Sequence, residues 1–144
     1  MSISNIEYPN DINLYCNSMN FGNPPNSAFQ KYVQAGYSTN TFGPFNGSSI
    51  GLFRQLDRVC SFSIAGVAGT FSVSAPIGLS TPLPQPPNIV LYYPIWVLDN
   101  NVRVLGTLKI DTSGNMIIYK NFSDNFTAGA CGFDSFSISY CSFI

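Results

Sequence analysis

The sequence predicts an all-β protein built as an antiparallel β-sandwich with an extended N-terminal arm. Three observations predict this fold. Apolar and polar residues alternate with a period close to two over most of the chain after residue 50, which is typical of half-buried strands. Prolines, glycines and Asp/Asn clusters separate these runs at short intervals, as turns do. The 3.6-residue period of a helix does not occur in this part.

Residues 1–49 are predicted to form an extended, aromatic-rich anchoring arm, and residues 50–144 the sandwich domain. Prolines and asparagines interrupt the arm, and it sustains no period of two or of 3.6. Aromatic residues nevertheless recur throughout it, which a disordered linker has no reason to show. We expect the arm to lie on a surface of its own domain, of a neighbouring copy or of a larger particle. A helical turn is also predicted over residues 27–34, capped by Ser27.

Two strands are predicted first in the domain, over residues 58–64 and 70–75. In the first, Cys60, Phe62 and Ile64 share one face, and glycines in the short connection favour a hairpin between the two strands. Prolines recur through residues 76–88, and each removes a backbone donor from a ladder. This segment is therefore predicted to be a surface crossing between the two sheets.

The strongest strand signal covers residues 89–98. Asp99-Asn100-Asn101 follows it, and a second apolar run over residues 102–110 completes a predicted hairpin. An Asp-Thr-Ser-Gly turn then leads into a strand over residues 116–119, which extends the hairpin into a meander. Residues 121–132 are predicted to be a polar loop, and a last strand is predicted over residues 136–140.

The strand over residues 89–98 is apolar on both faces, whereas its hairpin partner carries Arg103, Thr107 and Lys109 on one side. A strand in a two-layer sandwich normally has one solvent-exposed face, so the second apolar face must be packed against the arm or another subunit. Charged residues make up only 9% of the chain, which favours another subunit. The candidate oligomer interface consists of Val90, Tyr92, Trp96 and Leu98.

No catalytic or metal site is predicted, and no cofactor is expected. The chain has no histidine, which excludes Ser-His-Asp and Cys-His catalysis and histidine-bound metals. Asp99 and Asp111 lie in predicted turns, where a carboxylate commonly accepts bonds from the local backbone. The four cysteines form no Cys-x-x-Cys pair, and buried free thiols are favoured over disulfides; they are Cys16, Cys60, Cys131 and Cys141.

The charge pattern argues against two classes of partner. The net charge is −1 and no run of Lys or Arg occurs, so neither nucleic acid nor an anionic membrane is an expected partner. The start of the sequence lacks the basic and apolar parts of a signal peptide, so synthesis in a host cytoplasm is expected. No ligand-contact residue is assigned, but the loops over residues 76–88 and 121–132 are candidates for receptor contact.

The order of these features resembles the head domains of phage and large-virus fibre or spike proteins. The resemblance covers about residues 50–142. It implies a compact jelly-roll-like sandwich that forms a homotrimer and binds a host surface glycan or protein. The segments that carry it are the Ser-rich strands over residues 58–75, Leu-Pro-Gln-Pro-Pro at 83–87, the strand-turn-strand over 104–119 and Phe-Ser-Ile-Ser-Tyr at 136–140.

We therefore expect a non-enzymatic viral structural protein that works as a trimeric head or spike module on the virion surface. It would attach to a host receptor or to the virion, and the arm would bind a capsid or spike protein. Two alternatives remain open. One is a minor capsid-cementing protein without a host ligand, and the other is a non-viral sugar-binding lectin.

Overall fold

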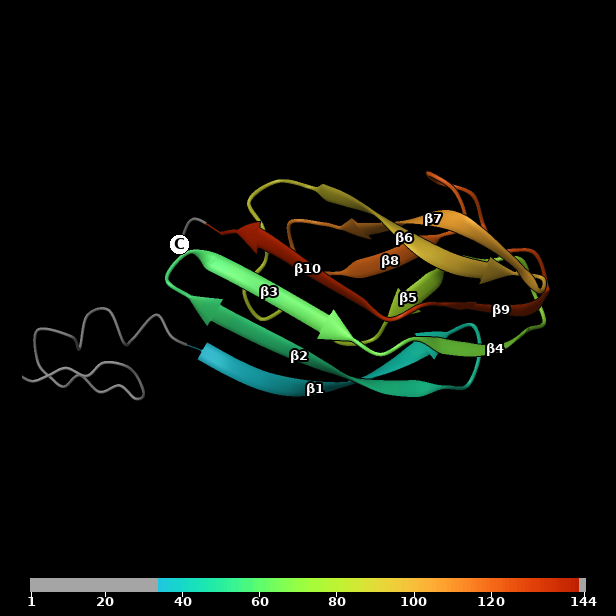
Figure 1. Ribbon diagram of the computed structural model, residues 1–144, viewed down its shortest axis with the longest axis horizontal. Coiled ribbons are helices and arrows are strands. Elements are labelled where there is room, and N and C mark those ends of the chain that lie inside the picture. Colours follow the sequence, from blue (N-terminus) through green and yellow to red (C-terminus); the bar gives the residue numbers. More distant parts are fainter. Residues whose placement is uncertain (1–33, 143–144) are drawn as a thin grey trace, which may run out of the picture. The chain divides into compact units, whose positions relative to one another are not determined.

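The computed structural model describes residues 34–142, which form ten antiparallel strands and no helix (Figure 1). The strands follow one another in a single curled sheet in the order β10-β3-β2-β1-β5-β8-β7-β6-β9-β4. The predicted antiparallel all-β sandwich is therefore confirmed. Most of the predicted arm, Cys16 and all but the last residue of the helical turn expected over residues 27–34 lie outside the described residues; that last residue, Gln34, begins a strand.

Curling of the sheet produces two layers with the core between them (Figure 1). One layer contains β1 (Gln34–Gly43), β2 (Ser48–Leu56), β3 (Val59–Ile64) and β10 (Phe136–Cys141). The other contains β5 (Ile77–Leu79), β8 (Met116–Tyr119), β7 (Val102–Ile110), β6 (Leu91–Asp99), β9 (Gly129–Phe133) and β4 (Val67–Phe71). Buried phenylalanine rings pack against one another in the core: the ring of Phe71 is stacked on that of Phe45 at 5.1 Å and meets that of Phe126 edge to face at 5.6 Å.

The sheet begins before the predicted domain boundary. Strand β1 starts at Gln34 and β2 at Ser48, so the prediction that residues 34–49 belong to an arm is wrong. The side chain of Asn40 is fully buried and accepts a hydrogen bond from the backbone N–H of Thr81 at 3.0 Å. A polar residue at such a core position hides the period of two, which explains why the pattern alone does not reveal β1.

Strands β3 and β4 are consecutive but do not pair with each other, so the hairpin predicted from residues 58–64 and 70–75 is wrong. Strand β3 pairs with β2 and β10, while β4 pairs with β9. Strand β4 also ends at Phe71, which leaves most of the second predicted strand outside regular structure. Local alternation identified the β3 strand correctly, but it carries no information about the distant partner.

These four strands form one bent ribbon, which we define as β3–β4 paired along its length with β9–β10. A two-residue link joins the strands on each side, and the register continues through the bend: Ile64 lies opposite Phe136, and Val67 opposite Phe133. At the bend, the N–H of Gly66 donates to Ser135 Oγ at 2.8 Å. The bent ribbon thus carries one antiparallel ladder from the first layer into the second.

The hairpin of β6 and β7 and the added strand β8 are confirmed. Pairing runs from Leu91 opposite Ile110 to Asp99 opposite Val102. The two turn residues both have positive φ, 49° at Asn100 and 69° at Asn101, which matches the type I′ turn that asparagine favours. In the next turn, Asp111 Oδ1 accepts from the N–H groups of Ser113 at 2.8 Å and Asn115 at 3.0 Å, so its predicted local role is confirmed.

Both predicted loops contain a strand. Within residues 76–88, β5 pairs with β1 and β8, so this segment is not wholly a crossing between sheets. Its proline-rich remainder is held against the domain because Tyr140 Oη donates to the carbonyl of Gln85 and Ser142 Oγ donates to that of Pro86. Within residues 121–132, β9 begins at Gly129, so only the first part is a loop.

Candidate functional site on the outer face of β6 and β7

Alternation along β6 directs one set of side chains into the core and the other outward. Ile95 and Val97 are buried, whereas Trp96 between them is exposed. Across the hairpin, Leu105 lies opposite Trp96, and Thr107 opposite Pro94. We define the outer face as the outward residues of this hairpin together with Phe122 from the following loop: Tyr92, Pro94, Trp96, Leu98, Arg103, Leu105, Thr107, Lys109 and Phe122.

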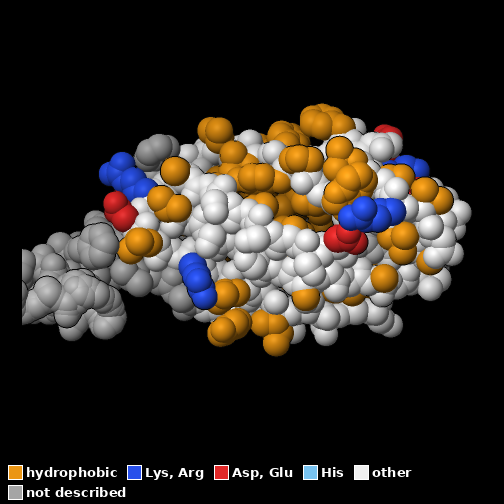
Figure 2. All heavy atoms as spheres, in the orientation of Figure 1, with side chains coloured by type: hydrophobic (Ala, Val, Ile, Leu, Met, Phe, Trp, Pro, Cys, Tyr) orange, Lys and Arg blue, Asp and Glu red, His pale blue; other side chains and the backbone are white. Residues whose placement is uncertain are grey.

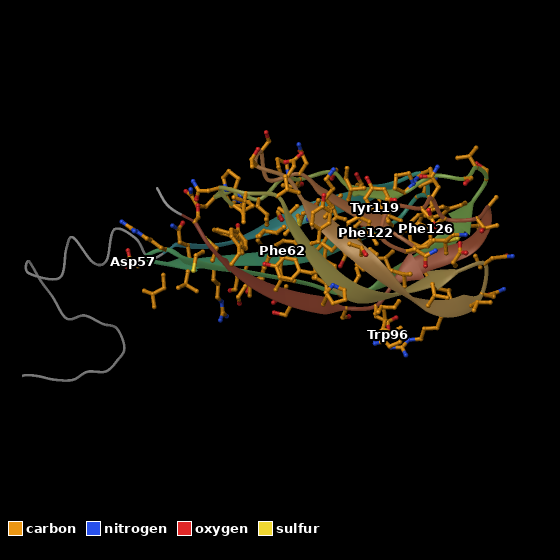
Figure 3. All side chains as sticks on the ribbon, turned by 90° about the horizontal axis from the view of Figure 1, so that it is seen from above. Asp57, Phe62, Trp96, Tyr119, Phe122 and Phe126 are labelled. Carbon is orange, nitrogen blue, oxygen red and sulfur yellow. The ribbon has the colours of Figure 1, made fainter. Side chains whose placement is uncertain are left out.

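The outer face exposes several large apolar side chains. The exposed fraction is 48% for Tyr92, 46% for Trp96, 53% for Leu105 and 65% for Phe122. In the space-filling view, hydrophobic side chains gather over β6 and charged ones are few (Figure 2). Figure 3 shows Trp96 projecting outward from the ribbon. Contiguous apolar surface of this kind commonly marks a contact site for another molecule.

An aromatic pair borders a groove on this face. The rings of Tyr92 and Phe122 are stacked, with centroids 5.2 Å apart and an interplanar angle of 29°. The groove has a volume of about 370 Å³ and no charged residue lines it. We call it the aromatic groove, and it is lined by Tyr92, Tyr93, Pro94, Leu105, Gly106, Thr107, Asn121 and Phe122.

A charged pair lies at the other end of the outer face. The guanidinium of Arg103 lies 4.4 Å from the centroid of the Trp96 ring and donates to Asp134 Oδ2 at 2.8 Å. Both charged side chains are at least half exposed, so the ion pair contributes at most about 1 kcal/mol to stability. Its clearer effect is geometric, because a cation over the ring restricts the orientation of Trp96.

A partly buried cluster fixes the loop that carries Phe122. Asp99 Oδ1 accepts from the N–H of Thr127 at 2.7 Å, and Asp99 Oδ2 accepts from Lys120 Nζ at 3.3 Å. Burial raises the pKa of Asp99, but the bonds from Thr127 and Lys120 outweigh burial and hold the pKa below its ordinary value. The predicted bond of Asp99 to its own turn is therefore wrong, because this carboxylate binds a different loop.

The four predicted interface residues lie near one another on the surface. Tyr92, Trp96 and Leu98 are on the outer face, and Val90, which precedes β6, is 40% exposed. An oligomeric role for them stays a prediction. The sequence reasoning missed Leu105 and Phe122. Cross-strand pairing with Trp96 could have found Leu105, but Phe122 reaches the face through a loop whose path depends on Asp99.

Outside the outer face, the features of the described residues that would bear on function are metal-binding groups, reactive thiols and membrane-spanning helices. No group of three His, Cys, Asp or Glu side chains suited to a metal ion occurs between residues 34 and 142. Cys60 and Cys131 are buried free thiols, as predicted, whereas Cys141 is exposed, so the prediction is wrong there. In the same range, no helix has the length and apolar character needed to cross a membrane.

Comparison with known proteins finds a likeness in structure but none in sequence. No protein-family model matches the chain, and no curated protein matches its sequence. Among solved structures, the chain is similar to the attachment protein sigma1 of a reovirus, determined in complex with α-2,3-sialyllactose. The TM-score is 0.47 and the sequence identity 13%, over 78% of this chain and 67% of that one.

Proposed function

We propose that this chain is a non-enzymatic viral structural protein whose domain works as a trimeric head or spike module on the virion surface. One observation carries the oligomeric part of the proposal: the outer face presents Trp96, Leu105 and Phe122 to solvent at 46 to 65% exposure. The viral setting rests on the resemblance of residues 58–75, 83–87, 104–119 and 136–140 to fibre and spike heads.

The composition of the outer face suits a contact between copies. Interface centres are enriched in aromatic residues and arginine and depleted of other charged residues. Here Tyr92, Trp96 and Phe122 supply the aromatic surface, and the Arg103–Asp134 pair lies beside it with both side chains partly exposed. Only 9% of the residues in the chain are charged, which leaves little to keep such a surface dispersed in water.

Sedimentation velocity on the full chain tests the proposal. We expect a trimer, and we expect Leu105→Ser to weaken association at least tenfold because it places a polar group in the contact. Val102→Ser is the matched control, since Val102 is 59% exposed on the same strand but is not part of the outer face. A chain that stays monomeric at every concentration would contradict the proposal, and so would equal effects of the two variants.

A sugar-binding role is the second candidate, favoured by the aromatic groove. The exposed rings of Tyr92 and Phe122 could stack on a sugar ring, and Asn121 and Thr107 offer an amide and a hydroxyl for hydrogen bonds. A glycan array separates the alternatives. A trimer that binds glycans supports a receptor-binding head, a trimer without a ligand supports a capsid-cementing protein, and a monomer that binds glycans supports a lectin.

Attachment of the module through its N-terminal arm to a capsid or spike protein is part of the same proposal. The part of that arm before β1 lies outside the described residues. Location on the virion and the absence of enzymatic activity are likewise proposed. Co-sedimentation of the full chain with purified particles would test attachment directly.

A further inference from the structure

We propose that the aromatic groove binds a short part of residues 12–30 of a neighbouring copy of this chain. This inference rests on the proposed oligomeric function and names the contact that would join the copies. The groove lies on the outer face, between the Tyr92–Phe122 ring pair and Leu105.

The chemistry of the groove restricts its occupant. Its lining contains the rings of Tyr92, Phe122 and Pro94 and no charged side chain, whereas the Tyr93 side chain points to the other face, where its hydroxyl donates to the carbonyl of Ser139. A charged group would find no ionic partner among the lining residues, whereas apolar and aromatic groups would contact the exposed rings. The occupant should therefore be an uncharged segment with aromatic or proline side chains.

One segment of this chain has that composition. Residues 12–30 contain no Asp, Glu, Lys or Arg, and they include Phe21, Pro24-Pro25 and Phe29. Proline-rich segments bind in aromatic-lined grooves because their extended backbone is already restricted before binding. The other proline-rich stretch, residues 82–87, is already held within the domain by Tyr140 and Ser142.

The residues before β1 give the proposed segment a long reach. Fully extended, the residues between Phe21 and Gln34 span about 45 Å. Strand β1 itself, with ten residues, is about 33 Å long. Two strands, β5 and β8, separate β1 from β7 in the sheet, so a segment seated in its own groove would have to turn back across the sheet.

Photocrosslinking of the full chain tests the inference. Tyr92 is replaced by p-benzoylphenylalanine, and the variant is mixed with ¹⁵N-labelled copies before irradiation. Trypsin releases residues 1–31 as one peptide because Lys31 is the first basic residue. We expect crosslinks from position 92 of one copy to the 1–31 peptide of another, at least fivefold more than from the same probe at Val102, which lies outside the groove lining.

The outcomes separate this inference from the function on which it rests. An oligomer whose position-92 crosslinks join only domain peptides, or join residues 1–31 of the same copy, would overturn the inference and leave the oligomeric function standing. A monomer by sedimentation would overturn the oligomeric function itself.

A double substitution in the proposed segment tests the inference without altering the groove itself. Phe21→Ser combined with Phe29→Ser should weaken association at least tenfold, because both rings lie in the proposed segment. Tyr8→Ser, outside residues 12–30, is the control and should leave association within twofold of the unmodified chain. Equal association of the double variant and the control would also overturn the inference.

Discussion

The guanidinium of Arg103 lies over the Trp96 ring at 4.4 Å and is also ion-paired with Asp134. Trp96 belongs to β6, Arg103 to β7 and Asp134 to the link between β9 and β10. An exposed tryptophan is thus restrained by a cation that a third segment of the chain holds in place. This restraint lowers the entropy that Trp96 would lose in a contact with another molecule.

Arg103→Gln should change the environment of Trp96 more than the stability of the fold. The chain has one tryptophan, so native fluorescence reports on this site alone, and we expect a shift in its emission. The free energy of unfolding should fall by no more than about 1 kcal/mol, because the ion pair is exposed. Urea unfolding measures the second effect, with Lys109→Gln as control. A loss above about 2 kcal/mol would mean that the pair is a structural support.

Gly106→Ala should destabilise the domain by about 1 to 3 kcal/mol. A Cβ at Gly106 would collide with the backbone oxygen of Tyr119 and would lie 2.8 Å from a methyl group of Val97. Gly78→Ala is the matched control, since a Cβ there has no neighbour within 4 Å. Urea denaturation compares the two variants, and equal midpoints would contradict the close approach of β7 to its neighbours.

Asp99→Asn should lower stability by about 1 to 2 kcal/mol at pH 7, because the bonds to Lys120 and Thr127 lose their ionic part. The folded protein holds the pKa of Asp99 below 3.8, so ionisation of Asp99 stabilises the fold above that pH. The difference between the unmodified chain and the variant should shrink as the pH falls below 3.8. Unfolding curves from pH 7 to pH 2 measure this difference in stability, with Asp124→Asn at an exposed site as the control. A difference that stays constant with pH would contradict the stabilising role of ionised Asp99.

Alkylation should distinguish the cysteines of the domain. Burial raises the pKa of the Cys60 and Cys131 thiols, which reduces the reactive thiolate, and both side chains are inaccessible. Cys141 is exposed. With iodoacetamide at pH 8, chymotryptic mapping should find Cys141 modified well before the two buried residues, whose labelling should require denaturant. Equal rates in the native protein would argue against the burial of Cys60 and Cys131.

The sequence predicts the part of the fold that depends on neighbouring residues. Strands β6 and β7 and the Asn100-Asn101 turn follow from alternation and turn chemistry, and so does the turn at Asp111. Pairing between distant strands could not be predicted in this way. The alternation of apolar and polar residues does not reveal β9, and the reason is physical. Gly132 lies so close to the backbone of Val67 that no side chain fits at this position, so the strand lacks a residue that would show the alternation.

The sequence likewise predicts only that part of the candidate site that depends on neighbouring residues. Alternation within β6 places Tyr92, Trp96 and Leu98 on one face, as the structure shows. Phe122 joins them from the loop after β8, which Asp99 holds through Thr127 and Lys120. That contact joins residues far apart in the sequence and depends on where two strands end. No local pattern specifies it.

The bent ribbon also determines how this domain should come apart. Its ladder begins at Val59 opposite Cys141 and ends at Phe71 opposite Gly129, without a slip at the bend. If either layer unfolded, strands that continue into the other layer would therefore lose part of their hydrogen-bonded pairing. Neither half could persist as a partly folded intermediate, so thermal denaturation of the domain should be a single cooperative transition.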